Sequence, residues 1–202
     1  MKKVILACFL FSWLISFAQD DSTEQRGFRK ENLFTGGSVT VSFGNGTFQG
    51  GVNPQLGYSI TKWLDAGVVV NYIYTSYRDN QVFNDKLRQT IYGGGLFTKV
   101  YPVRFLFAQA QLEHNFITQK YIPPNGGTTE KTNVNATSFL VGAGYATGRN
   151  PVSGNSYGYL AVLFDVMKDD HSPYRDFAGR VNPIIRAGFH IPLFQGKSNN
   201  NY

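Results

Sequence analysis

The sequence predicts an all-β protein, a single eight-stranded antiparallel up-and-down barrel that spans a membrane. Three observations predict this fold class. Apolar and polar residues alternate along eight segments, polar turn signals separate the segments, and aromatic residues lie near the segment ends. Because successive strand side chains point to opposite faces, each segment has one apolar face and one polar or small face. Runs of about ten residues with aromatic ends are typical of strands that cross a membrane.

The start of the chain has the features of a secretory signal peptide. Two lysines precede an apolar run at 4–17, and small residues at its end match a signal-peptidase site. We therefore expect a cleaved signal at 1–18 and a mobile periplasmic lead at 19–32. An uncleaved anchor and a lipoprotein signal at Cys8 are the alternatives. Cys8 is the only cysteine, so the mature chain would contain no disulfide and no thiolate metal site.

Eight segments after this lead show the alternation. The opening hairpin, 48–74, shows it most clearly, because a short turn at 61–63 separates two regular runs. The expected strands are 33–43, 48–60, 64–74, 88–101, 105–121, 134–146, 156–167 and 177–194. They give one barrel domain at 33–194 and a short polar tail at 195–202. A barrel of eight strands has an interior that side chains fill, rather than an open pore.

The connections between these strands differ in length at the two ends. A periplasmic N-terminus places three turns in the periplasm and four loops outside. The periplasmic turns would be 61–63, 102–104 and 148–155, and the outer loops 44–46, 77–87, 122–133 and 168–176. Most of the outer connections are long and polar, whereas two of the periplasmic ones are very short. This asymmetry is typical of outer-membrane barrels.

On these features the chain resembles the small eight-stranded outer-membrane barrels, a group that includes the OmpA transmembrane domain and the OmpX and OmpW types. The resemblance covers roughly 33–194, and the segment 187–194 looks like the closing strand that the barrel-assembly machinery recognises. The chain departs from the family where residues follow Phe194, since such barrels often stop at the aromatic residue. The abundance of Tyr, Asn and Gly and the cleavage region also resemble Bacteroidota envelope proteins. The resemblance implies localisation in the bacterial outer membrane.

The charge of the chain bears on its partners. The formal net charge is +6, but the basic residues are scattered along the sequence. An exported protein rarely meets nucleic acid, so we expect no nucleic-acid partner. Contact with outer-membrane lipid and lipopolysaccharide, whose headgroups are anionic, is the expectation that we favour.

Charged residues on the predicted inner face form the first candidate site. A buried charge is costly unless it is paired, and a set of mixed sign supplies pairs. We interpret this set as a polar network that fills the lumen, with a conduit or a hidden catalytic group as the functional alternative. Glu113 and Arg186 both lie near mid-strand, so they are the first candidates for an ion pair. The predicted lumen network consists of Asp65, Lys99, Glu113, Asp165, Arg186 and His190.

Aromatic residues near the strand ends form the second set. Tyrosine and tryptophan favour the interface between lipid and water, so we interpret the set as an aromatic girdle; carbohydrate stacking is the alternative. The predicted girdle consists of Tyr58, Trp63, Tyr72, Tyr74, Tyr92, Tyr101, Tyr145 and Tyr157.

Catalytic signals in the sequence are weak. Some eight-stranded barrels are lipid A deacylases that use a Ser/His pair, but His171 and Ser172 fall in a predicted loop. His114, with Thr118 or Ser138, is no better arranged. The charged cluster around His171 is more simply a solvated loop than a metal site. We therefore predict no catalytic residue, cofactor or metal.

Four functions remain as hypotheses. The first is a non-enzymatic outer-membrane barrel with a structural, adhesive or surface-binding role through its outer loops, whose extracellular partner the sequence does not specify. The second is a soluble, lipocalin-like ligand carrier with apolar residues inside. The third is a lipid A-modifying enzyme, and the fourth is a narrow channel, which a filled eight-stranded interior disfavours.

Overall fold

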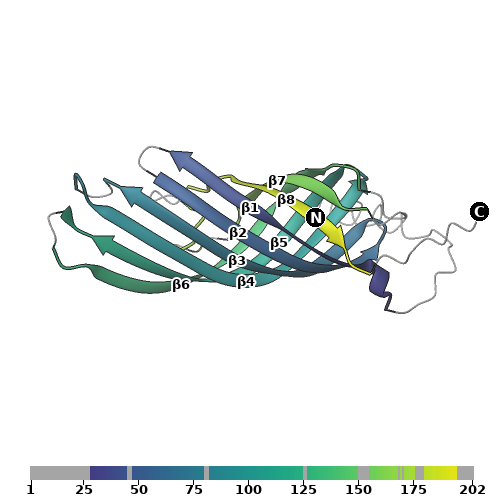
Figure 1. Cartoon of the computed structure of the whole chain (residues 1–202), viewed down its shortest axis with the longest axis horizontal. Helices are drawn as coiled ribbons and strands as arrows, with labels where there is room; N and C mark the ends of the chain where they lie inside the picture. The colour runs from purple at the N-terminus through teal and green to yellow at the C-terminus, as the bar shows by residue number, and fades with distance from the viewer. Residues whose placement is uncertain are drawn as a thin grey trace, which may run out of the picture.

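The eight strands form one closed antiparallel sheet in the computed structural model (Figure 1). The structure describes residues 28–44, 47–79, 82–124, 127–149, 155–167, 169, 171–175 and 180–194. The strands are β1 (Leu33–Gly44), β2 (Thr47–Thr61), β3 (Leu64–Arg78), β4 (Lys86–Val103), β5 (Leu106–Ile122), β6 (Glu130–Ala146), β7 (Tyr157–Asp165) and β8 (Ile184–Pro192). Each strand pairs with its sequence neighbours, and β1 pairs with β8 to close the ring. The predicted eight-stranded up-and-down barrel is confirmed.

The N-terminal side of the barrel carries a short helical turn, η2 (Lys30–Asn32), at the same end as the tight turns between strands (Figure 1). Asn32 Nδ2 donates to the carbonyl of Ser59 at 3.0 Å, which holds η2 against β2. Within the described residues, no helix is long and apolar enough to cross a membrane. The predicted signal peptide, most of the predicted lead and the predicted tail lie outside the described residues.

The alternation in the sequence determines which side chains face the interior. Along β7, every second residue from Tyr157 to Asp165 is buried, and the residues between them are exposed or half-exposed. The interior face is rich in amides and charged groups, whereas the exterior face carries Leu, Val, Ile and aromatic side chains. The barrel is therefore apolar outside, while its interior combines buried amides and ion pairs with apolar clusters, unlike a soluble barrel.

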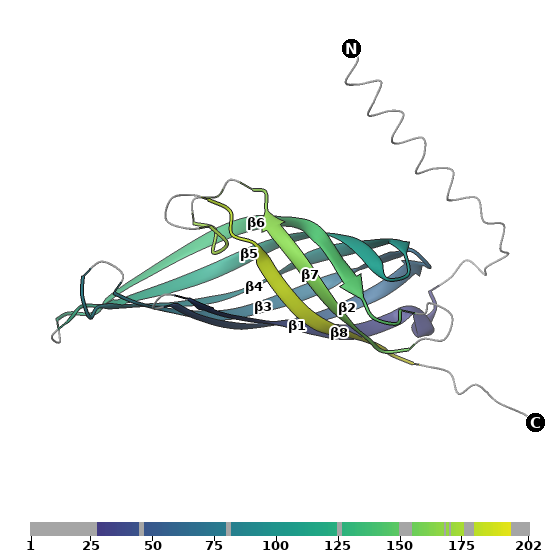
Figure 2. The same ribbon diagram turned by 90° about the horizontal axis from the view of Figure 1, so that it is seen from above.

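The strands differ strongly in length, which makes the barrel lopsided. β2 to β6 contain 15 to 18 residues each, whereas β7 and β8 contain 9 each. β7 pairs with β6 only over Leu140–Ala146, so the first part of β6 continues beyond the ring. Figure 2 shows the ends of the long strands projecting together on one side. We call this projecting part of β3 to β6 the outer extension.

Several predicted boundaries were wrong, each for a local reason. β8 begins at Ile184, and residues 180–183 lie outside it, because Pro183 has no N–H for the ladder and interrupts the run. The predicted start at 177 lies outside the described residues. β4 continues through Pro102 to Val103, where an irregular register beside Val100 accommodates the proline. The polar outer loops are shorter than predicted, because polar residues extend β4 to Lys86 and β6 to Glu130 by strand pairing alone.

Candidate functional site

The centre of the barrel interior is organised around Glu113 of β5. Its Oε2 accepts hydrogen bonds from Asn71 Nδ2 at 2.7 Å and Gln111 Nε2 at 2.6 Å, and its Oε1 accepts one from Asn115 Nδ2 at 2.8 Å. Arg186 Nη2 lies 3.9 Å from Glu113 Oε2, and Arg186 Nη1 donates to Gln111 Oε1 at 3.2 Å. A buried carboxylate with these partners is well compensated. Glu113 and Arg186, expected to meet, are thus brought together.

Amide side chains extend this centre toward β1. Asn53 Nδ2 donates to Asn71 Oδ1 at 3.0 Å, and Ser38 Oγ donates to Asn53 Oδ1 at 3.4 Å. All three residues are buried. Sequence reasoning singled out the charged residues and left these amides out of the site, although they lie on the same alternating face. These side chains matter because their hydrogen bonds form a continuous chain from Glu113 of β5 through β3 and β2 to β1.

The end of the barrel near the tight turns contains a second ion pair. Arg149 Nη2 donates to Asp65 Oδ1 at 3.1 Å, and Arg149 Nη1 donates to the carbonyl of Lys62 at 2.6 Å. The guanidinium also lies over the ring of Tyr101, 3.8 Å from its centroid. Arg149 lay in a predicted turn and was missed. The signal that could have found it is the need of Asp65, an inward acid, for a cation.

Lys99 has a different kind of partner from the one expected of a salt-bridged network. Its Nζ donates to Gln55 Oε1 at 3.3 Å and lies 4.1 Å from the ring centroid of Tyr159. The rings of Phe97 and Phe107 lie slightly farther from the same nitrogen, at 5.3 and 5.4 Å. Aromatic faces attract a cation, so the rings compensate this buried ammonium together with one amide.

The other mouth of the interior is closed by the connection between β7 and β8. Asp165 Oδ2 accepts a hydrogen bond from Ser172 Oγ at 2.5 Å, and Ser138 Oγ lies 3.3 Å from the same hydroxyl. Tyr174 is buried and packs in an apolar cluster that includes Ile73. This connection was predicted to be a polar outer loop. Its Ser172 and Tyr174 instead fill the barrel mouth.

The predicted aromatic girdle needs a correction at two positions. Tyr101 and Tyr157 are buried in the interior, because each lies on the inward parity of its strand. Their hydroxyls are 3.0 Å apart, and the Tyr157 hydroxyl lies 3.1 Å from His190 Nδ1. Trp63, Tyr72, Tyr92 and Tyr145 are exposed on the outside, whereas Tyr58 and Tyr74 are half-buried.

His114 and His171 do not lie beside the hydroxyl groups that the sequence suggested as their partners. His114 is exposed on the outer face, where Nδ1 lies 2.9 Å from Thr137 Oγ1, not beside Ser138 or Thr118. His171 Nδ1 lies 3.8 Å from Asp169, and the hydroxyl of the adjacent Ser172 bonds to Asp165 instead. Within the described ranges, no group of three or more His, Cys, Asp or Glu side chains could hold a metal ion.

Beyond the ring, β6 has an open edge. The N–H groups of Thr137 and Phe139 point toward the β7 side, where Asp169 Oδ2 and Asp165 Oδ1 accept them at 2.9 and 3.1 Å. Backbone direction alternates along a strand, so the N–H groups of Lys131, Asn133 and Asn135 point the same way. There, no described strand pairs with them.

Asp169 is the acid that ends this edge. Its Oδ1 also accepts the backbone N–H of His171 at 3.0 Å. Partial burial raises the pKa of Asp169, but the hydrogen bonds from the Thr137 and His171 backbones outweigh that effect and lower it below its ordinary value. The carboxylate therefore fastens the β7–β8 connection to β6 at the point where pairing stops.

Comparisons with known proteins add little. No protein-family model matches the chain, and no curated protein is similar to it in sequence. Among solved structures, the barrel is similar to the attachment invasion locus protein Ail of Yersinia pestis, solved in complex with the heparin analogue sucrose octasulfate. The two are 10% identical, the match covers 79% of this chain and 96% of that chain, and the TM-score is 0.44. These values carry no functional argument, and the fold assignment rests on the strand pairing of this chain.

Proposed function

We propose that this protein is an integral barrel of the bacterial outer membrane whose role is binding at the cell surface rather than catalysis. The observation that carries the membrane placement is the apolar exterior of the barrel around buried polar groups. Leu96, Val70 and Ile185 are more than half exposed on the outside, whereas Asn53, Asn71 and Glu113 are almost fully buried inside. An apolar belt of this kind is stable in lipid and would aggregate in water.

The same polarity argues against a soluble ligand carrier. A lipocalin-like barrel needs an apolar cavity, but the interior here is crossed by amides and ion pairs. Export through a cleaved signal peptide, insertion by the barrel-assembly machinery and contact with outer-membrane lipid and lipopolysaccharide are part of this proposal. The chain would cross the membrane with its tight turns in the periplasm and the outer extension outside.

The membrane placement can be tested by fractionation. We expect the protein in the outer-membrane fraction, released only by detergent, and we expect the unboiled form to migrate differently from the boiled form on a gel. Recovery as a soluble periplasmic protein would overturn the proposal. A variant with Glu on the outer face, Leu96→Glu, is expected to fail insertion, whereas Leu96→Val is expected to behave like the wild type, because a charge on the lipid face is costly.

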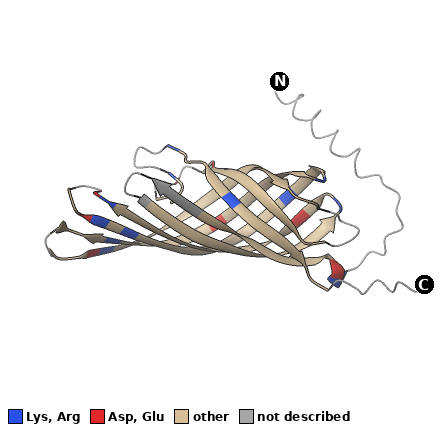
Figure 3. Ribbon diagram, turned by 45° about the horizontal axis from the view of Figure 1, so that its top comes forward, with Lys and Arg blue, Asp and Glu red and all other residues tan. Residues whose placement is uncertain are grey.

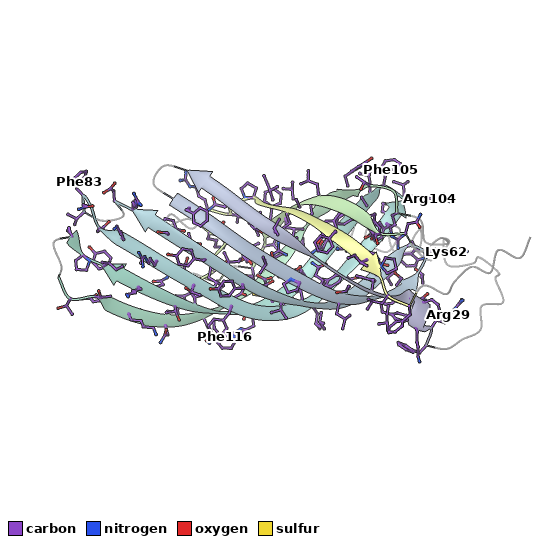
Figure 4. All side chains as sticks on the ribbon, in the orientation of Figure 1. Arg29, Lys62, Phe83, Arg104, Phe105 and Phe116 are labelled. Carbon is purple, nitrogen blue, oxygen red and sulfur yellow. The ribbon has the colours of Figure 1, made fainter. Side chains whose placement is uncertain are left out.

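The outer extension supports the binding role in two ways. The open edge of β6 offers the N–H groups of Asn133 and Asn135, which no described strand pairs with, and an extended segment of another protein can add there as a further strand. The connection between β3 and β4 also holds Phe83, 85% exposed, at the far end of the extension (Figure 4). The loop is held by Asp79, whose Oδ1 accepts the N–H of Asn84 at 2.6 Å. An exposed ring on a fastened loop is typical of a contact surface.

Strand addition can be tested with a displayed library of extended peptides selected on the mature protein in detergent micelles. We expect the wild type to enrich peptides with alternating side chains. Replacing Asn133 and Asn135 by proline removes the two open N–H groups without breaking a backbone hydrogen bond to β5, and it loses only the exposed side-chain bond from Thr118 to Asn133, so the barrel should still fold. This variant should lose the selected peptides, and the loop variant Thr128→Pro should keep them. Equal binding by both variants would show that the edge is not the binding site.

A further inference from the structure

The outer extension carries five basic side chains on the face that points away from the barrel axis. They share the outward parity of Tyr92 and Phe116, and four of them are exposed while Lys86 is half-exposed. Figure 3 shows basic segments, with acidic ones beside them, at the far end of the long strands. We call this set the basic face; it consists of Arg78 of β3, Lys86 and Arg88 of β4, Lys120 of β5 and Lys131 of β6.

The register of the sheet places these charges directly beside one another. Arg88 is opposite Lys120, and Lys120 is in turn opposite Lys131. Arg78 is opposite Lys86 one step farther out. The Cβ atoms of directly opposite residues are about 5 Å apart, and like charges in such positions destabilise a sheet. Among the described residues, none of the five has an acidic partner within ion-pair distance.

Charged side chains in the interior of the same barrel each have a compensating partner. Asp65 has Arg149 beside it, Glu113 has Arg186, and Lys99 has aromatic rings. Among the residues that the structure describes, the basic face has no ion pair of this kind. A ligand with several negative charges would remove the repulsion and gain from each side chain.

The height of the basic face relative to the apolar belt indicates where that ligand lies. Tyr92 and Phe116 stack on the outside with ring centroids 5.5 Å apart, which marks the upper edge of the belt. Arg88 and Lys120 each lie four positions farther along the same strands. Four residues at ~3.3 Å rise and ~45° tilt amount to roughly 9 Å along the membrane normal. The polar headgroup layer is about 5–7.5 Å thick on each side of the bilayer, so the backbone of Arg88 and Lys120 lies just above it and their long side chains can reach back into it.

We propose that the basic face binds the phosphate groups of a glycolipid in the outer leaflet of the membrane. A headgroup approaches from the side at this height, and the side chains point sideways, whereas a soluble partner would first meet the tip that carries Phe83. Thr118 and Asn133, hydrogen-bonded to each other at 2.9 Å, lie between the aromatic pair and the basic row and offer polar groups to the sugars of such a lipid. The proposal rests on the outer-membrane placement and deepens it.

Native mass spectrometry of the mature protein in detergent micelles tests this directly. Bisphosphorylated lipid A and the same lipid without phosphates are titrated separately. Arg88, Lys120 and Lys131 should together make the wild type bind the phosphorylated lipid ~100-fold more tightly, since each Lys or Arg near an anionic surface contributes about fivefold. The variant Arg88→Gln, Lys120→Gln, Lys131→Gln should lose this preference. It removes like-charge repulsion, so it should fold, and heat-modifiable migration on a gel confirms that it does.

A matched control makes the same charge change at the opposite end of the barrel, at Lys30, Lys62 and Arg104, which are exposed beside the tight turns. The last two are labelled in Figure 4. This control should keep the wild-type preference. A preference that survives in the basic-face variant, or that is missing from the wild type, overturns the proposal. Full competition between dextran sulfate and the lipid would also overturn the proposal, because the basic face would then bind a soluble polyanion. Failure of the membrane placement has a separate readout, folding without detergent.

Discussion

Arg149 donates to Asp65 across 3.1 Å and so joins the connection between β6 and β7 to the start of β3. Both side chains are buried, with 5% and 0% of their surface exposed. Because the two residues are 84 positions apart, the pair fastens distant parts of the chain at the end of the barrel where the turns are tight. The guanidinium of Arg149 also compensates the buried charge of the Asp65 carboxylate at this end of the interior.

Removing the arginine should destabilise the barrel. Arg149→Met leaves Asp65 buried without its cation, and loss of one partner of a buried pair costs about 3–5 kcal/mol. Urea unfolding of the refolded protein in detergent micelles measures the change. Arg104→Met at an exposed turn is the control, expected within about 0.5 kcal/mol of the wild type. If Arg149→Met matched that control, the pair would have no stabilising role.

Glu113 should be sensitive to both charge and hydrogen bonding. Glu113→Leu leaves the amides of Asn71, Gln111 and Asn115 without their acceptor and Arg186 without its carboxylate, and each unsatisfied buried group costs about 1–3 kcal/mol. Glu113→Gln keeps one acceptor oxygen, so its loss of unfolding free energy should be smaller. The same urea titration ranks the two. The reverse order would show that packing, rather than hydrogen bonding, dominates at this position.

Two neighbouring glycines should respond differently to alanine. A Cβ on Gly95 would collide with the carbonyl oxygen of Leu112 and lie 2.7 Å from Cα of Glu113, whereas a Cβ on Gly94 meets only the carbonyl of Val69, at 3.2 Å. Backbone atoms in a closed ladder cannot move aside cheaply, so Gly95→Ala should lower the free energy of unfolding by about 1–3 kcal/mol. Gly94→Ala should cost less. The folded fraction on an unboiled gel and the urea midpoint report both effects.

The hydrogen bond from the Thr137 N–H to the Asp169 carboxylate should weaken at low pH, and the pKa of Asp169 determines where. The pKa of this carboxyl is lowered in the folded protein from its ordinary value of 3.8, so its stabilising contribution is complete above that value. The contribution is lost as the pH falls through the lowered pKa. Amide hydrogen exchange at Thr137, whose N–H the carboxylate accepts, should accelerate relative to other β6 amides only under strongly acidic conditions. Asp169→Ala should show the faster exchange at every pH.

Alternation along the chain was sufficient to predict the barrel and the inward or outward direction of most strand residues. Period-two patterning reports direction, which is why Asp65, Glu113 and Arg186 were placed inside. It does not report what a connection does after it leaves the strand. Arg149 and Tyr174 were missed for this reason, since both come from connections that fold back into the interior.

Strand ends were the other weak point. Outside an apolar belt the alternation disappears, but backbone pairing continues, so the polar stretches around Lys86 and Glu130 looked like loops. Tyr101 and Tyr157, which also lie near strand ends, were assigned to the wrong face of the barrel. Aromatic residues near strand ends were taken as interfacial, and only their parity reveals that they fill the lumen.

The short strands give this barrel a preferred place to open. The ladder between β1 and β8 extends only from Phe34 to Val39, and both ladders of β7 are similarly brief, whereas β4 and β5 are paired along nearly their whole length. Fewer hydrogen bonds must break there for two strands to separate. We therefore expect the ring to open first at this seam when the barrel unfolds. The fully paired strands β4 and β5, on the other side of the barrel, would stay paired while these short ladders open.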